Sequence, residues 1–336
     1  EEAVANALPK LPVQFIDFAY WQKSLESQGL LATDVSFWYN QVVASTPPLI
    51  LDVPIDKPRP RVWNATGATE RILYANDLLL AVSEKNARAT PFAVTMANWG
   101  IVMSRASGDN YVNIAVPFAL RNMSSLMHLI GNFLNMMPVR VQHDPNEPYN
   151  TMLTRVAASA VDVQRHSLGG FVQLLNETQK HYPTTDPSRN PVYSTMVDLI
   201  PNDSDTPSSG LSGVLDIFLF VNTRAGAIWS LDCVYNSTIL EPQTVRQMLM
   251  MMPAVARQAA RAINEPIPRV LPLVEEAQPS QSTSVALTSL LIQMGGLPRM
   301  VPVTSGWEVQ GAPTAYFGIR QGGRLKRHSG LELSAD

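Results

Sequence analysis

Residues 214–236, VLDIFLFVNTRAGAIWSLDCVYN, hold the clearest structural pattern in the chain. Two runs rich in β-branched and aromatic side chains, 214–222 and 227–236, flank a short connection, 223–226, that contains glycine. Strands favour these side chains, and a short glycine-containing loop can reverse the chain between them. The stretch therefore predicts two strands joined as a β-hairpin.

The segment that follows the hairpin predicts a long helix. Pro242 stands where a first-turn proline belongs, and the apolar spacing continues to about residue 263. The methionine-rich run 248–252 lies inside this helix. Thioethers at helical spacing fill gaps in cores far more often than they bind copper, so the run indicates core packing.

The segments that precede the hairpin alternate between helical and extended patterns. Helices are expected at 11–28 (ending near Gly29), from Thr33 or Asp34 to the prolines at 47 and 48, at 76–87 (capped by Asn76), 91–104 and 149–166, with a short one after Gly169-Gly170; strands are expected at 68–74, 111–116 and 130–141. The order strand, two helices, strands, helix, strand, hairpin, helix indicates an α/β fold, a mixed sheet covered by helices.

Three segments lack such a pattern. Five prolines between residues 47 and 60 predict an extended connector, because each removes a backbone donor and restricts φ. Residues 201–213 are dense in Asp, Ser, Pro and Gly and predict a solvated loop. Residues 277–336 hold 8 of the 18 glycines without a regular period, which predicts a poorly ordered tail.

The composition excludes several classes of protein. With 46% apolar and 16% charged residues, the 336-residue chain can fill a core and is not intrinsically disordered. A net charge of −3 disfavours nucleic acid and anionic membranes as partners. The single cysteine, Cys233, excludes an internal disulfide and fits a reducing, cytoplasmic location. The chain begins with Glu1 and shows no leader, so we expect a piece of something longer.

The usual motifs of nucleotide-binding and hydrolytic enzymes are absent from the sequence. There is no P-loop and no G-x-G-x-x-G, and the tetrapeptide GLSG at 210–213 lacks the spacing of a nucleophile elbow. The five histidines are scattered without metal-ligand spacing. A catalytic metal is therefore not expected.

Four short motifs nevertheless occur in a recognisable order. They are FIDFAYWQ at 15–22, LILDVPIDKPRP at 49–60, IGNFLN at 130–135 and DPSRNPVY at 186–193. They resemble Y-x-D-[FY]-A-x-W, L-x-L-P-x-D-R-P-R-P, I-G-x-F-V-N-T and D-x-S-R-N-P-L-F of the condensation domains of non-ribosomal peptide synthetases. Residues 269–276, RVLPLVEE, are similar to the linker that leaves such a domain toward an adenylation domain.

The resemblance implies a fold of two chloramphenicol-acetyltransferase-like lobes arranged as a V around a tunnel. Under this mapping, 1–46 are the end of the first lobe, 47–61 the Pro-rich inter-lobe linker, 62–276 the second lobe and 277–336 the tail. We expect the exposed inter-lobe face of such a piece to favour self-association.

The resemblance also implies a reaction, in which the amine of one carrier-bound aminoacyl group attacks an acyl or peptidyl thioester on another carrier. The family's signature H-H-x-x-x-D-G contains the histidine placed beside that amine, and this chain has no adjacent histidine pair. The hypothesis is therefore a partial condensation domain that is inert alone. The alternative is a non-catalytic module that docks carrier proteins or partner domains, and a weaker third is an acyltransferase with a substitute base.

Candidate site residues follow from the motifs. Asn135 and the turn Ser188-Arg189-Asn190 match positions near the family's reaction channel, although the turn residues also suit a purely structural role. His166 aligns with the histidine of the sixth motif, H-Q-D-x-P-F-E, of which the stretch 166–172 otherwise keeps only Phe171. His128 and His166 are the weak candidates for a substitute base.

The expected partners follow from the resemblance as well. They are peptidyl or acyl carrier proteins, whose phosphopantetheine arms would enter the tunnel, and the adjoining synthetase domains. No cofactor is expected to bind the chain directly. The identity of the donor and acceptor substrates does not follow from the sequence.

Overall fold

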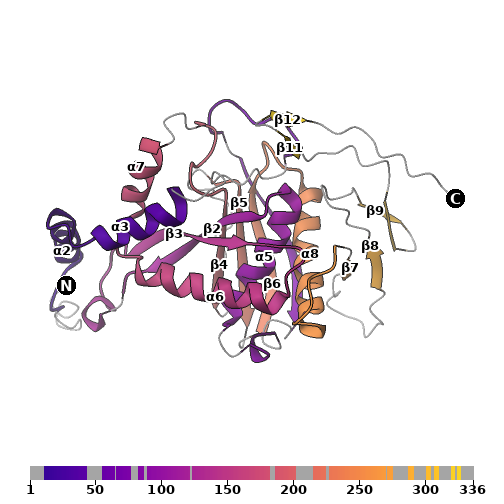
Figure 1. Ribbon diagram of the computed structural model, residues 1–336, viewed down its shortest axis with the longest axis horizontal. Helices are drawn as coiled ribbons and strands as arrows, with labels where there is room; N and C mark the ends of the chain where they lie inside the picture. Colours follow the sequence, from indigo (N-terminus) through magenta and orange to yellow (C-terminus); the bar gives the residue numbers. More distant parts are fainter. Residues whose placement is uncertain are drawn as a thin grey trace, which may run out of the picture.

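The computed structural model describes most of the chain between residues 11 and 274, together with five short strands beyond it. The described residues are 11–43, 55–64, 66–76, 82–86, 89–121, 123–181, 186–201, 215–224, 227–269, 271–274, 287–290, 300–303, 306–309, 319–321 and 324–326. Figure 1 shows an α/β fold built around one large sheet.

The elements of this part of the chain alternate as the sequence indicates. The helices are α2 (Phe15–Ser27), α3 (Ala32–Trp38), α5 (Pro91–Ser107), α6 (Tyr149–Arg165), α7 (Phe171–His181) and α8 (Pro242–Arg261), with a π-helical turn at Tyr39–Val43 and a 3-10 turn at Ser124–Leu126. The large sheet contains β1 (Gly67–Asn76), β2 (Tyr111–Ala119), β3 (Leu134–Gln142), β4 (Thr195–Pro201), β5 (Ile217–Arg224) and β6 (Ala227–Asn236). Short two-stranded ladders join β7 (Leu271–Val274) to β8 (Leu287–Leu290), β9 (Met300–Val303) to β10 (Gly306–Val309) and β11 (Ile319–Gln321) to β12 (Arg324–Lys326).

The hairpin predicted at 214–236 is confirmed and lies inside the large sheet. β5 and β6 pair antiparallel, from Ile217 opposite Tyr235 to Arg224 opposite Ala227. The strand order β1-β6-β5-β4-β2-β3 places this pair between β1 and β4. β4 runs parallel to both of its neighbours, β5 and β2, whereas the other pairs are antiparallel. The sheet is therefore mixed, and the predicted α/β fold class is confirmed.

The order of elements inferred from the sequence includes a strand before the hairpin, but no sequence pattern gave its bounds. In the structure this strand is β4. Its sequence, TMVDLIP, carries Asp198 at its centre, where a charged side chain interrupts the apolar run. The side chain is partly buried, and this burial raises the pKa of the Asp198 carboxyl. A strand that contains an acid in its middle is hard to recognise from hydrophobic periodicity alone.

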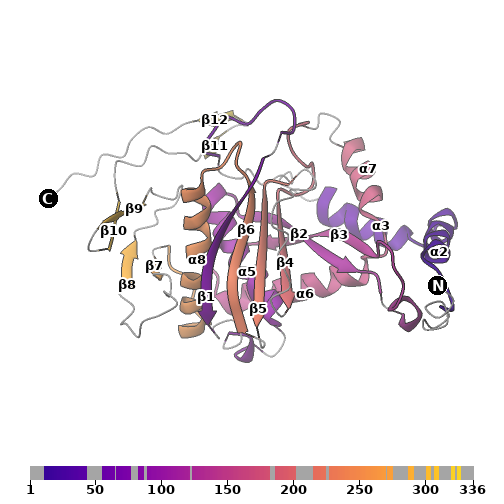
Figure 2. The same ribbon diagram turned by 180° about the vertical axis from the view of Figure 1, so that it is seen from behind.

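Three helices cover one face of the sheet, and Figure 2 shows β1, β6 and β5 in front of them from the opposite side. α8 packs against β1 and β6, α5 against β2 and β3, and α6 against β3. Trp99 of α5 donates from Nε1 to Oγ1 of Thr195 on β4 at 2.9 Å. A Cβ atom on Gly100 would lie 2.4 Å from Cγ1 of Val141, so glycine lets α5 approach β3 closely.

The methionine-rich run of α8 belongs to the core, as predicted. Met248, Met250, Met251 and Met252 are all buried in the main hydrophobic cluster or beside it. The helix continues through Pro253 to Arg261. These flexible thioether side chains fill the space between the helix layer and the sheet.

The two N-terminal helices form where they were expected. The backbone N–H of Gln14 donates to Oδ2 of Asp17 at 2.8 Å, which caps the first turn of α2. Gly29, with φ of 69°, ends α2 as predicted. The predicted cap of α3 at Thr33 or Asp34 is wrong, because α3 already begins at Ala32. Asp34 instead directs its carboxylate to a distant loop.

Two other predicted boundaries differ from the structure. Asn76 does not cap a helix but ends β1, where it pairs with Ile228 of β6, and only 82–84 of the described part of 76–87 are helical. The strand predicted from Ile130 begins at Leu134, and the Ile130 side chain is 94% exposed. The apolar run 130–133 was therefore misread as strand, because it forms a loop between β2 and β3.

Several predictions fall mainly outside the described residues. Residues 55–60 of the connector have no helix or strand, whereas 47–54 lie outside. The predicted loop 201–213 also lies almost entirely outside the described residues, since only Pro201 is described, as the end of β4. Most of 277–336 also lies outside. Among the described helices, none is both long and apolar enough to cross a membrane.

A buried histidine joins the helix layer to the end of β3. Oγ of Ser104 on α5 donates to the carbonyl of Asp109 at 2.6 Å, and Nδ1 of His143 lies 3.2 Å from the same Oγ. Burial, with the nearby Arg105 guanidinium as a smaller cause, lowers the pKa of His143 to about 4. The folded protein therefore holds this ring neutral.

This neutral histidine predicts a loss of stability in mild acid. The unfolded chain protonates His143 near pH 6.5 while the folded chain resists protonation until about pH 4, so the free energy of unfolding falls as the pH drops between these values. Urea unfolding at a series of pH values measures this slope, and His143→Gln should flatten it. The exposed His128→Gln is the control, and an equal effect of both substitutions would contradict the assignment.

Candidate functional site

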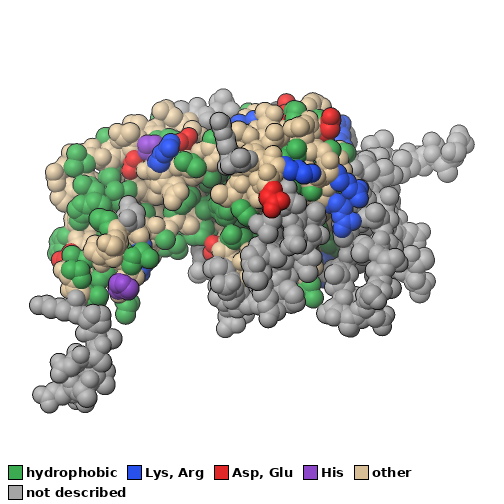
Figure 3. Space-filling view, turned by 90° about the horizontal axis from the view of Figure 1, so that it is seen from below, with side chains coloured by type: hydrophobic (Ala, Val, Ile, Leu, Met, Phe, Trp, Pro, Cys, Tyr) green, Lys and Arg blue, Asp and Glu red, His purple; other side chains and the backbone are tan. Residues whose placement is uncertain are grey.

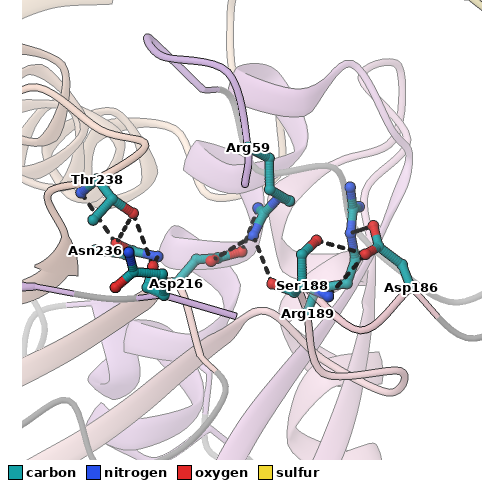
Figure 4. A network of polar contacts seen from close by, with 8 residues as sticks. Arg59, Asp186, Ser188, Arg189, Asp216, Asn236 and Thr238 are labelled. Carbon is teal, nitrogen blue, oxygen red and sulfur yellow. Dashed lines mark hydrogen bonds and ion pairs between the residues drawn. The ribbon is translucent and has the colours of Figure 1, made fainter. Parts of the chain in front are cut away.

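Two motif segments and the start of β5 meet at the side chain of Arg59, as Figure 4 shows. The Arg59 guanidinium donates to Oδ1 and Oδ2 of Asp216 at 2.9 and 2.7 Å, and to the carbonyl of Ser188 at 3.3 Å. The Arg59 and Asp216 side chains are only 9% and 1% exposed. A bidentate pair in this position fastens the proline-rich connector to both the turn and the sheet.

The turn at 186–193 is held together by its own side chains. Oδ1 of Asp186 accepts from the backbone N–H and the hydroxyl of Ser188 at 2.8 and 2.6 Å, and Oδ2 accepts from Nε of Arg189 at 3.0 Å. Burial opposes ionisation, but the hydrogen bonds from Ser188 and the Arg189 charge lower the pKa of the Asp186 carboxyl. Oδ1 of Asn190 accepts from the N–H groups of Val192 and Tyr193. The predicted residues Ser188, Arg189 and Asn190 thus belong to one hydrogen-bonded turn.

The connector is also fastened to the start of α8. Asp56 accepts from the backbone N–H of Glu241 at 2.7 Å and from the hydroxyl of Thr244 at 2.8 Å. Lys57 forms an ion pair with Glu241 at 3.0 Å. A carboxylate at a helix N-terminus satisfies its exposed N–H groups and interacts favourably with the helix dipole.

Asn135 lies on β3 and is buried. Its Nδ2 donates to the carbonyls of Ser167 and Gly169 at 2.7 and 3.4 Å, and its Oδ1 accepts from the N–H of Phe171 at 3.4 Å. The amide therefore holds the whole loop between α6 and α7, which is the segment that aligns with the sixth family motif.

The same loop is in contact with α3. Nδ1 of His166 lies 2.8 Å from Oδ1 of Asp34, and the imidazole stacks on the Phe37 ring with centroids 4.2 Å apart. Nε1 of Trp38 donates to the carbonyl of His166 at 3.0 Å. His166 thus lies beside the Asn135 cluster, whereas His128 is exposed on the loop that precedes β3.

A chain of contacts connects Asn135 to the turn. Phe171 bonds to Asn135 through its backbone, and its ring lies 5.2 Å from the Tyr193 ring, centroid to centroid. Tyr193 in turn donates its N–H to Asn190 at 3.2 Å. We call the set Asn135, Phe171, Tyr193 and Asn190 the motif seam. The structure thus links Asn135 to Asn190 through these contacts, whereas Ser188 and Arg189 precede Asn190 in the same turn and are held by Asp186.

The first and third motifs meet in a separate aromatic cluster. The rings of Phe15 and Phe18 on α2 lie 5.1 and 4.8 Å from the Phe133 ring. A Cβ atom on Gly131 would lie 2.4 Å from the Phe15 ring, and the Arg121 guanidinium sits 4.1 Å above Phe133. This cluster fastens α2 to the loop that links β2 and β3.

Sequence reasoning did not identify Asp34 or Asp216 as structural partners. Asp216 offered a signal, since it is a single acid within an apolar run, VLDIFLF, and such an acid requires a cationic partner when buried. Its partner, Arg59, lies 157 residues away. Asp34 offered no signal, because an acid near the start of a helix is common.

The candidate site residues serve mainly to hold neighbouring segments in place. No group of three or more His, Cys, Asp or Glu in the described part of the chain is placed to hold a metal ion. The thiol of Cys233 is fully buried, and burial raises its pKa. The polar side chains of the motif seam bond mainly to backbone, so their arrangement fixes loop geometry.

Comparison with known proteins gives a consistent result. A family model described as the condensation domain matches residues 3–278. The phosphinothricin tripeptide synthetase PhsC of Streptomyces viridochromogenes is 27% identical over 277 residues, which cover 77% of this chain and 25% of that protein. The malpibaldin synthetase of Mortierella alpina is 26% identical over 283 residues, or 79% of this chain and 5% of that protein. The chain thus spans a quarter or less of these curated relatives.

Solved structures show the same fold. The X-domain in its complex with OxyB from teicoplanin biosynthesis matches with a TM-score of 0.65 at 18% identity, covering 77% of this chain and 60% of that one. The condensation domain of the monacolin K polyketide synthase MokA matches with a TM-score of 0.61 at 14% identity, covering 74% and 61%. The described part of the chain therefore has the fold of these domains.

The buried pair at Arg59 predicts a large loss of stability on truncation. Arg59→Met leaves the Asp216 carboxylate buried without its cation, which should lower the free energy of unfolding by about 3–5 kcal/mol in urea titrations. The control is Arg165→Met, which removes an exposed ion pair with Asp162 and should cost less than about 1 kcal/mol. Equal losses in the two variants would contradict the role of Arg59.

Proposed function

Because the chain belongs to the condensation-domain family, we propose that it is the second-lobe part of a condensation domain in a non-ribosomal peptide synthetase. Domains of this family form amide bonds between carrier-bound substrates. A C–N bond forms to the acyl carbon and the C–S bond of the thioester breaks. The amine loses a proton, and the departing carrier thiolate gains one.

The motif seam is the observation that carries this proposal. Segments that match the family's motifs come from distant parts of the sequence, and Asn135, Phe171, Tyr193 and Asn190 join them. We propose that this seam shapes the wall of a channel toward the missing lobe. Asn135 and Ser188 would hold that wall, and Arg189 and Asn190, which are less buried, would lie nearest to the substrates.

The proposed organisation follows the same mapping. Residues 1–46 would be the end of the first lobe, 47–61 the linker, 62–276 the second lobe and 277–336 a tail. The match to only about 60% of the X-domain chain supports a partial domain. The partners would be carrier proteins, which bring their substrates on phosphopantetheine arms, and adjoining synthetase domains. A solved four-domain non-ribosomal peptide synthetase, 19% of which matches this chain with a TM-score of 0.59, supports this setting.

We expect the chain to be inert alone, because it lacks the adjacent histidine pair of the family signature. The test incubates the full chain with an acyl-carrier thioester and an aminoacyl-carrier thioester, and measures the amide product by mass spectrometry. A fusion to the first lobe of a condensation domain that carries the H-H-x-x-x-D-G motif is expected to gain activity. The same fusion with its motif histidines changed to alanine is the control. Product from the chain alone would contradict the proposal.

A docking module without chemistry is the second candidate. The structural neighbour from teicoplanin biosynthesis was solved in a complex with another protein, OxyB, which supports a docking role for such a fold. The coding sequence upstream of Glu1 distinguishes the two candidates. An H-H-x-x-x-D-G motif within one lobe's length favours the synthetase, whereas a lobe with that motif eroded favours docking.

We also propose that the chain self-associates, because the inter-lobe face of a partial domain is exposed. Ile16 and Tyr20 on α2 are 58% and 69% exposed, and Met127 and Ile130 are exposed beside the aromatic cluster. Figure 3 shows hydrophobic side chains gathered at the end of the molecule that carries α2. Sedimentation of the full chain should show concentration-dependent dimers, which Tyr20→Glu weakens. The control is Val62→Glu, at an exposed position just after the connector. A monomer at all concentrations would contradict this proposal.

A further inference from the structure

We propose that Asp34 and His166 form a clasp that docks α3 onto the loop between α6 and α7. In this clasp His166 is a positioning residue, which fixes the loop relative to α3. This inference rests on the fold alone and does not depend on the proposed function. It gives a role to Asp34, an acid to which no family motif assigns one.

The first argument is that one carboxylate binds the loop at two points. Oδ1 of Asp34 lies 2.8 Å from Nδ1 of His166, and Oδ2 accepts from the backbone N–H of Gly169 at 3.0 Å. The Asp34 and His166 side chains are 17% and 25% exposed, so solvent screens the pair less than it screens a surface ion pair. Because an ionised carboxylate only accepts hydrogen bonds, the proton of this contact lies on Nδ1 of His166.

The second argument is that two further side chains of α3 contact His166. The Phe37 ring stacks on the imidazole at an interplanar angle of 19°, and Trp38, which is buried, bonds to the His166 carbonyl. These side chains occupy the same helix as Asp34. The orientation of the ring is therefore set by contacts from α3, which lies 132 residues earlier in the chain.

The third argument is steric. A Cβ atom on Gly169 would lie 2.5 Å from Cβ of Asp34, so a side chain at this position would push α3 away. A Cβ atom on Gly170 would meet only Oε1 at the end of the Gln173 side chain, which can rotate aside. The two adjacent glycines thus differ in their importance for docking, which provides a matched control.

The fourth argument is that the loop is anchored on its other side. Asn135 of β3 bonds to the carbonyls of Ser167 and Gly169. The Asp34 contact therefore extends a continuous path from α3 through the loop to the large sheet. The position of α3 therefore depends on the loop, which is itself held by β3 of the sheet.

Hydrogen exchange of the full chain tests the clasp. Asp34→Ala, and His166→Phe, which keeps a stacking ring but removes the donor, should each speed exchange of the α3 amides about tenfold. The double variant should exchange no faster than the faster single variant, because both remove one shared contact. His166→Gln, which retains a side-chain donor, should restore part of the protection.

The glycine pair and the hairpin supply the controls. Gly169→Ala should speed exchange in α3, whereas Gly170→Ala should leave it unchanged. Amides of β5 and β6 report whether a variant has lost the whole fold. Additive effects of the Asp34 and His166 substitutions, unchanged exchange in α3, or equal acceleration in β5 and β6 would each overturn the clasp.

The tautomer of His166 gives a second, independent measurement. In the ¹⁵N spectrum of histidine-labelled protein above pH 7.5, the clasp requires a protonated Nδ1 on His166, and His166→Gln assigns the signal. Asp34→Ala should shift that signal toward the Nε2-protonated form. A signal that is insensitive to Asp34→Ala would overturn the assignment of the shared proton.

Discussion

The ion pair between Arg59 and Asp216 is the contact on which the arrangement of the connector, the turn 186–193 and the large sheet depends. Asp216 is almost completely buried immediately before β5, so a carboxylate there is tolerable only with a cation that binds both oxygens. The connector supplies that cation, and the same guanidinium also binds the Ser188 carbonyl. The requirement of one buried acid thereby brings the connector, the turn and the sheet to a common point.

Local patterns were enough to predict most elements of the fold. The hairpin, α5, α6 and α8 were predicted because their signals are local. Apolar side chains are spaced regularly along each element, and prolines or glycines stand near the ends. The errors arose where tertiary contacts override such patterns. Asn76 resembles a helix cap but pairs with β6, and Asp34 resembles one but binds His166. Leu134, and not Ile130, begins β3, because Phe133 is drawn into the cluster with Phe15 and Phe18.

The sequence motifs name candidate site residues but do not predict the contacts between them. The motifs point to Asn135 and Ser188-Arg189-Asn190 separately, and nothing in a linear pattern shows that Phe171 and Tyr193 join them. Nor could spacing reveal that the amide of Asn135 is used to hold a loop. Contacts over more than a hundred residues, such as Arg59 to Asp216, depend on the folded topology, which short motifs do not encode.

The pairing of β1 with β6 has a consequence for how the protein is made. β1 spans Gly67–Asn76, yet its only ladder partner in the described sheet, β6, ends at Asn236. At a ribosomal rate of roughly 5–20 residues per second, β1 waits on the order of 10 s or more for its neighbour to emerge. During synthesis its backbone N–H and C=O groups form an open edge. The nascent chain thus exposes these unpaired groups until β6 emerges.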